Sequence, residues 1–126
     1  MLQTTLLKNI MSTTQELHIR ETEEQEIISF FKRYEKNTSL KYVYAGALYR
    51  YLNYDIKLTY EFLEQLTNLK SLKRIYEFRC PCSSSRKIFY CDYTSLPDRV
   101  FCDECGEEFT TRDYIYVIYE VILWWK

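Results

Sequence analysis

All five cysteines of this 126-residue chain lie between residues 80 and 105. The second half of this window reads Cys102-Asp-Glu-Cys105-Gly106, in which two residues separate the two thiols. That is the ordinary spacing of a metal-binding turn that aims two thiolates at one ion, and the glycine that follows suits the tight backbone of such a turn. The cysteine window therefore predicts a metal site, and the rest of the chain must fold around it.

A four-cysteine site needs two further thiols from the first half of the window. Cys80-Pro-Cys82 is the preferred pair, although Ser83 stands where the usual Cys-Pro-x-Cys turn has its second thiol. A Cys-x-Cys pair can chelate one ion if the backbone bends. The predicted ligands are Cys80, Cys82, Cys102 and Cys105. Cys91 is a substitute ligand, but its strand-like surroundings, IFYCDY, favour a small buried hydrophobic side chain.

The predicted ion is a single structural Zn²⁺. Four thiolates complete a tetrahedral site and leave no position for a reacting water. Carboxylates flank the second pair, but the His-x-Glu or Cys-x-Glu element of zinc deaminases does not precede it, so a solvated edge is the better interpretation. Two alternatives stay open: five structural thiols that cluster without an ion, and a redox-active thiol protein. Redox pairs, however, are generally Cys-x-x-Cys at the start of a helix.

The N-terminal residues contain no apolar run of signal-peptide length, and no segment reaches the roughly 18 apolar residues that span a bilayer. We therefore expect a cytoplasmic protein with no membrane association. Thiols stay reduced in that compartment, which favours a metal site over a disulfide framework.

Hydrophobic periodicity predicts helices first and strands afterwards. Residues 1–21 form a leader that is either mobile or a short helix. A capping pattern at Thr22-Glu-Glu-Gln25 predicts a helix over about 23–36, and apolar residues at helical spacing predict two more, over about 40–53 and about 59–70. Strands are expected over 72–79, 87–93, 99–102 and 114–125, since these segments alternate or are rich in β-branched and aromatic residues.

These elements predict an α+β fold with three parts. Residues 1–21 are the leader, residues 22–79 a three-helix unit similar to a winged helix, and residues 80–126 a β-rich zinc ribbon with a C-terminal strand. Three helices followed by a strand is the element order of a winged helix, in which the second and third helices form a helix-turn-helix. A generic three-helix bundle with an appended strand is the alternative.

A winged helix followed by paired cysteines resembles the alpha subunit of archaeal transcription factor E and small adaptor proteins of bacteria and mobile elements. The resemblance covers about Thr22 to Trp125 and depends on the helix spacing, one Cys-Pro pair and Cys102-x-x-Cys105-Gly106. It implies that Cys80, Cys102 and Cys105 are zinc ligands and that Cys82 is one through a shifted turn. It also implies a role as an adaptor beside a larger partner.

The distribution of charge favours a protein partner over nucleic acid. Residues 80–126 hold five basic and eight acidic side chains, a balance of −3, whereas residues 1–79 hold twelve and ten, a balance of +2. The aromatic C-terminal strand, if exposed, offers a docking surface or a pairing edge that could form a homodimer; otherwise it closes the domain's own sheet. The expected partner-binding residues are Tyr116, Ile118, Trp124 and Trp125.

A DNA-binding transcriptional regulator is the second functional hypothesis. Local excesses of basic residues supply candidate phosphate contacts at Lys41, Arg50, Lys73 and Arg74. Against it, the predicted third helix carries Glu61 and Glu64, which repel phosphates. An enzyme is not expected: the chain has no Gly-rich phosphate loop, no Gly-x-Ser-x-Gly and a single histidine, His18.

Overall fold

The computed structural model describes residues 4–37, 39–82 and 87–122, except for the side chain of Thr4. The chain is α+β, with four α-helices in the N-terminal half and a β-rich C-terminal half built from antiparallel hairpins. It divides into two compact units. We call residues 74–118 the thiol unit, and the described parts of 1–73 and 119–126 the helical unit.

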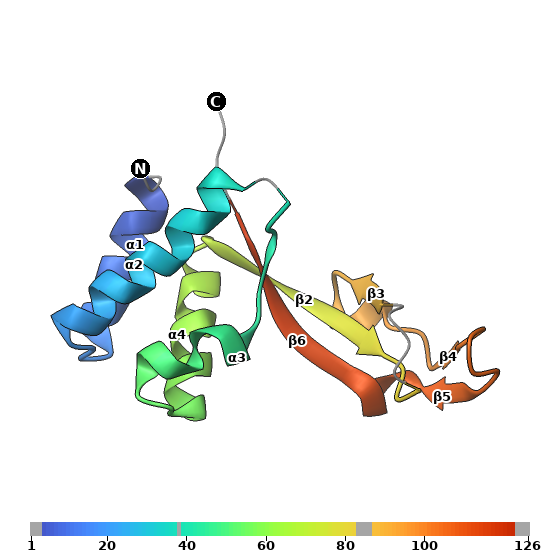
Figure 1. Ribbon diagram of the computed structural model, residues 1–126. Coiled ribbons are helices and arrows are strands. Elements are labelled where there is room, and N and C mark those ends of the chain that lie inside the picture. The colour runs from blue at the N-terminus through green and yellow to red at the C-terminus, as the bar shows by residue number, and fades with distance from the viewer. Residues whose placement is uncertain (1–3, 38, 83–86, 123–126) are drawn as a thin grey trace. The chain divides into compact units, whose positions relative to one another are not determined.

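The helical unit contains α1 (Thr4–Glu16), α2 (Glu21–Lys36), α3 (Ala45–Leu48) and α4 (Ile56–Asn68), shown from blue to green in Figure 1. Aliphatic and aromatic side chains from α2, α3 and α4 are almost completely buried in its core: Ile27, Phe31, Leu48, Phe62, Leu63 and Leu66. The predicted helix over 23–36 is confirmed as α2. The third predicted helix is α4, which begins earlier because the side chain of Asp55 caps it by accepting a hydrogen bond from Leu58 N–H.

The leader was expected to be either mobile or a short helix, and its residues Thr4–Glu16 form the helix α1. Leu6 and Ile10 are buried on one face of α1, and Thr13 and Thr14 continue that buried face. The buried hydroxyls have partners: Thr14 donates to the Glu24 carboxylate, and Thr13 donates to the backbone of its own helix. The helix is therefore part of the core.

The predicted helix over 40–53 is wrong in its first third. Tyr42–Val43 is a short strand, β1, which pairs antiparallel with the C-terminal strand so that Val43 lies opposite Tyr119. Only Ala45–Leu48 is α-helical, and a 3₁₀ turn, η1 (Tyr49–Leu52), follows it. Strand pairing overrides the helical periodicity here because β-branched and aromatic residues fit a sheet well.

One four-stranded sheet has the order β1-β6-β2-β3. Its longer strands are β2 (Leu72–Arg79) and β6 (Ile115–Val121), and β3 (Lys87–Tyr90) pairs antiparallel with the end of β2. The strands predicted in these three regions are thus present. The strand β3 ends earlier than expected, and residues 123–125 of the predicted C-terminal strand lie outside the described residues. Residues of β2 and of β6 belong to both compact units.

The thiol unit also contains a second hairpin, in which β4 (Arg99–Phe101) pairs with β5 (Glu108–Thr110). Two 3₁₀ turns, η2 (Tyr93–Ser95) and η3 (Thr111–Tyr114), flank it. The strand β5 was not predicted. Within the described residues, no helix is long and apolar enough to cross a membrane.

Candidate metal centre

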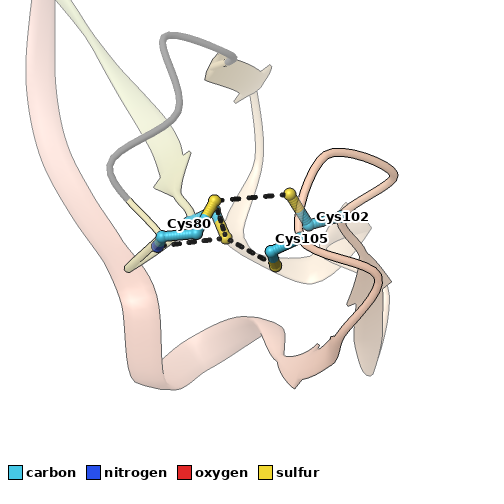
Figure 2. Close-up of side chains that lie close together, drawn as sticks. Cys80, Cys102 and Cys105 are labelled. Carbon is cyan, nitrogen blue, oxygen red and sulfur yellow. Dashed lines mark hydrogen bonds between the residues drawn. The ribbon is translucent and has the colours of Figure 1, made fainter.

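Four cysteines converge in the thiol unit, and strand ends place them there. Cys80 directly follows β2, and Cys82 lies in the turn after it. Cys102 directly follows β4, and Cys105 lies in the turn that leads to β5. Figure 2 shows Cys102 and Cys105 facing Cys80 from the opposite turn. The two turns therefore bring the two cysteine pairs together.

Every pair of the four Sγ atoms lies within 4.8 Å. The Sγ atom of Cys80 is 3.7 Å from that of Cys105, and the Sγ atom of Cys82 is 3.7 Å from that of Cys102. A tetrahedral four-thiolate site with Zn–S bonds of about 2.3 Å has sulfur atoms about 3.8 Å apart. The two distances between the turns match that geometry.

The Cys-x-Cys pair departs from this geometry. The Sγ atoms of Cys80 and Cys82 are 3.1 Å apart, shorter than a tetrahedral edge and longer than the roughly 2.05 Å of a disulfide bond. Tetrahedral spacing requires this turn to open by about 0.7 Å between the Cys80 and Cys82 sulfur atoms. The shifted turn expected for a pair with one intervening residue is therefore compatible with a four-cysteine site.

Backbone geometry supports the second turn. Gly106 has φ +73°, in the left-handed region that glycine adopts without strain, and its N–H donates to the Cys102 carbonyl. The Cys102 N–H in turn donates to the Glu107 carbonyl. These two bonds close the Cys102–Gly106 segment into a knuckle that fixes the direction of both thiols.

The thiols have different proton affinities. Burial raises the pKa of Cys80 to about 12 and also raises that of Cys105. Hydrogen bonds from the backbone N–H groups of Cys105 and Glu104 lower the pKa of Cys102 to about 7. A coordinating thiol is deprotonated, so a cation at this point would favour the thiolate form of all four residues.

Cys91 lies outside the cluster. It follows β3 and is exposed, so the expectation that it is a small buried hydrophobic residue is wrong. The reason is that β3 ends at Tyr90, one residue before the thiol. The structure therefore assembles Cys82, and not Cys91, with the other three cysteines.

Two of the four residues expected to bind a partner, Tyr116 and Ile118, lie in the described part of the chain, and they differ in exposure. Tyr116 is 46% exposed, and the Arg79 guanidinium covers its ring at 4.3 Å from the centroid. Ile118 is only 1% exposed, which corrects its assignment to a docking surface, since its side chain packs inside the chain. Trp124 and Trp125 lie outside the described residues. In the sheet, β6 lies between β1 and β2, while a homodimer through this strand stays a prediction.

The four basic residues proposed for DNA contact come from three separate segments of the chain. Lys41 is exposed just before β1, and Arg50 is exposed on η1, where it donates to the Tyr51 hydroxyl. Lys73 and Arg74 are neighbours on β2, so their side chains point to opposite faces of the strand.

A buried charge cluster in the thiol unit was not predicted from the sequence. Glu77 on β2 has no exposed surface, and its carboxylate pairs with Arg79 at 2.7 Å and with Lys87 at 3.7 Å. The signal was present in the sequence: Glu77 and Arg79 are two residues apart on one strand and therefore share a face. The third member, Lys87, depends on the strand pairing that sets it opposite Arg79.

Comparisons of the chain with models of protein families, with curated proteins and with solved structures found no match.

Proposed function

We propose that the chain is a non-enzymatic, zinc-binding adaptor whose metal stabilises the thiol unit and whose helical unit docks on a larger protein. The observation that carries the metal part is the convergence of four thiols within 4.8 Å. Tetrahedral thiolate sites select zinc or iron–sulfur centres, and a single-ion site of this size fits Zn²⁺. Cys80, Cys82, Cys102 and Cys105 would hold it.

A structural role for the ion follows from the ligand set. Four protein thiolates fill the coordination sphere, so no position is open for a substrate or a reacting water. Two of the four cysteines, Cys80 and Cys102, also belong to the small apolar core of the thiol unit, together with Phe78 and Val100. Metal binding in a unit with so small a core contributes directly to folding.

The docking part of the proposal is supported by apolar side chains at the start of α4. Tyr54, Ile56 and Tyr60 are 67%, 53% and 38% exposed. Ile56 and Tyr60 are four residues apart and therefore lie on the same helix face. We call these three residues the α4 patch. Clustered exposed apolar side chains are typical of protein-binding surfaces.

The turn before α4 holds this patch in a strained conformation. Asn53 and Tyr54 have φ values of +60° and +55°, in the left-handed region, which is unfavourable for an aromatic residue. The Tyr54 ring packs edge to face on Tyr49, with centroids 5.5 Å apart. Backbone strain of this kind clusters at functional sites.

A winged helix is the architecture we propose for the helical unit. A short strand, two helical segments and two longer strands follow α2, and the sheet order β1-β6-β2 places the last strand between the other two. In that architecture the thiol unit is an insertion between the two strands of the wing, and α4 is the second helix of the helix-turn-helix. Its exposed Ile56, Tyr60 and Glu61 suit a protein better than DNA phosphates.

Metal content tests the first part of the proposal. Protein purified without added zinc should contain one zinc per chain by elemental analysis, and a thiol count should find one reactive cysteine, Cys91. Metal-free protein with fewer than five free thiols would contradict it and would support the redox alternative.

Partner association tests the second part. Ile56→Asp should abolish co-purification of the larger protein from native cells, because it places a charge in the α4 patch. The matched control is Phe101→Asp, which changes an exposed aromatic residue on β4. Equal loss in both variants would contradict the α4 patch as the docking surface, and a salt-dependent complex with duplex DNA would favour the DNA-binding regulator.

A further inference from the structure

A two-lobed groove lies on the helical unit between α2 and the α3–η1 segment. One hollow of about 390 Å³ is lined by Gln25, Glu26, Ser29, Phe30, Arg33 and Tyr51. A second hollow, of about 350 Å³, is lined by Phe30, Arg33, Tyr51 and three residues of α3 and η1: Gly46, Ala47 and Arg50. Because three residues line both hollows, the two are lobes of one groove.

Aromatic rings hold both guanidinium groups at this groove. The Arg33 guanidinium lies 4.7 Å from the centroid of the Phe30 ring, and that of Arg50 lies 4.8 Å from the Tyr51 ring. Arg50 also donates a hydrogen bond of 2.7 Å to the Tyr51 hydroxyl, and the two rings contact each other at 6.2 Å. Cation–π stacking restricts the rotamers of both arginines, which lowers the entropy cost of binding a ligand.

The charges of these two arginines are not balanced within the described residues. Arg20, Arg79 and Arg99 each pair with a carboxylate at 2.7–2.8 Å. Among residues 4–37, 39–82 and 87–122, no carboxylate pairs with Arg33 or Arg50. Two guanidinium groups lining one hollow repel each other, and an anion between them would remove that repulsion.

We propose that this groove binds an extended acidic segment of a protein partner, with a carboxylate at Arg33 and Arg50 and an apolar side chain beside Phe30 in the other lobe. Arginine recognises carboxylates in bidentate geometry. The inference rests on the proposed docking function and specifies the chemistry of the partner.

The composition of the other lobe favours a peptide over nucleic acid. Glu26 lines that lobe, so a uniformly charged phosphate backbone would meet a like charge close to Arg33. An acidic residue flanked by apolar ones avoids this repulsion. Gln25 and Ser29 supply groups that can hydrogen-bond a peptide backbone. In the second lobe, Gly46 leaves open space for a bound peptide, since a Cβ added at this position would meet no atom of another element within 4 Å.

The direct test is fluorescence anisotropy with short fluorescein-labelled peptides and the zinc-loaded full chain at low salt. The probes are a peptide of alternating Glu and Leu, its Gln–Leu counterpart, and a version with phosphoserine in place of Glu. The Glu–Leu peptide should bind and its Gln–Leu counterpart should not. The phosphoserine peptide shows whether phosphate serves as well as carboxylate.

Arg33→Gln and Arg50→Gln should each weaken binding of the Glu–Leu peptide about tenfold, which is about 1.4 kcal/mol. The matched control is Lys57→Gln, which removes one exposed positive charge on α4 and should bind as the parent does. Unchanged affinity in the double arginine variant, or equal binding of the Glu–Leu and Gln–Leu peptides, would overturn the inference. So would tighter, arginine-dependent binding of a labelled oligonucleotide.

Failure here is distinguishable from failure of the proposed function. A chain that retains zinc and loses its larger partner on Ile56→Asp, yet binds none of these peptides, keeps the adaptor function and refutes only the groove. A chain that lacks zinc, or that keeps its larger partner in the Ile56→Asp variant, refutes the adaptor function itself, whether or not the peptides bind.

Discussion

The helical unit and the thiol unit are both small, and each must bury enough surface to fold. They differ in the side chains that they bury. The helical unit buries large aliphatic and aromatic side chains, including Ile27, Phe31, Phe62 and Leu66. Among the described residues of the thiol unit, the buried cluster around the thiols has four members: Phe78, Cys80, Val100 and Cys102. Since two of these four are proposed metal ligands, metal coordination would replace apolar burial in a unit too small to supply enough of it.

Metal removal should produce the largest difference in stability between the two units. A chelator should unfold the thiol unit, because structural zinc contributes on the order of 10 kcal/mol to domains of this kind. The helical unit should keep its helices, because its core contains none of the four thiols. Hydrogen exchange measured with and without the chelator checks this: amides of β4 and β5 should lose protection, while those of α2 and α4 keep it. Simultaneous loss in both units would show that the chain folds as one cooperative block.

Core truncation in the helical unit is the reciprocal experiment. Phe31→Ala should destabilise that unit by about 3–5 kcal/mol, because it removes a fully buried ring and leaves a cavity. The zinc content should stay at one per chain. Phe101→Ala in β4 is the control, since this ring is 57% exposed and its loss should change the free energy of unfolding by less than about 1 kcal/mol. Loss of zinc in Phe31→Ala would show that the thiol site depends on the helical core.

Hydrophobic periodicity correctly predicted the helices and strands whose conformation follows from their own sequence. The α2 helix has buried residues at helical spacing, and β2 is a run of alternating character, so both were found close to their observed bounds. The four clustered cysteines were predicted for a similar reason, since the spacing of ligands within a turn is local chemistry.

Features set by distant partners were not predictable in the same way. Tyr42 and Val43 form a strand only because β6 lies beside them, and the hydroxyls of Thr13 and Thr14 obscure the buried face of α1. The α4 patch was missed because a helix pattern does not show that Ile56 and Tyr60 lack covering residues. The Arg33–Arg50 groove was missed because its two arginines come from separate elements.

The buried carboxylate of Glu77 offers a smaller test within the thiol unit. Glu77→Ala should destabilise this unit by about 1–3 kcal/mol, because it leaves the Arg79 and Lys87 cations without their buried partner. Both cations are partly exposed and can regain water, which limits the cost. Chemical denaturation of the zinc-loaded protein measures the change. Stability equal to that of the parent would mean that the buried charge cluster makes no net contribution to the stability of the unit.

Tyr34 allows a pH test that should affect only the helical unit. Burial raises the pKa of its phenol, and its hydroxyl donates a 2.9 Å hydrogen bond to the Tyr42 carbonyl. The contribution of the protonated Tyr34 phenol to the free energy of unfolding is fully present below the unfolded pKa of about 10. It is lost as the pH rises through the higher pKa of the folded state. Tyr34→Phe should cost about 1 kcal/mol at neutral pH and reduce the alkaline loss of stability in α2. An unchanged alkaline transition would exclude Tyr34 as its source.

The smallest effect is expected at Cys91. A substitution there distinguishes the four proposed ligands of the thiol unit from the remaining thiol. Cys91 is exposed and outside the four-thiol cluster, so Cys91→Ser should leave zinc content unchanged and alter the free energy of unfolding by less than about 0.5 kcal/mol. Cys82→Ser is the matched variant, since Cys82 is also exposed but lies 3.7 Å from the Cys102 sulfur, and it should lose the metal. Both variants remove one exposed thiol, so a difference between them isolates coordination from thiol chemistry in general. If Cys91→Ser lost zinc and Cys82→Ser kept it, Cys91 and not Cys82 would be the fourth ligand.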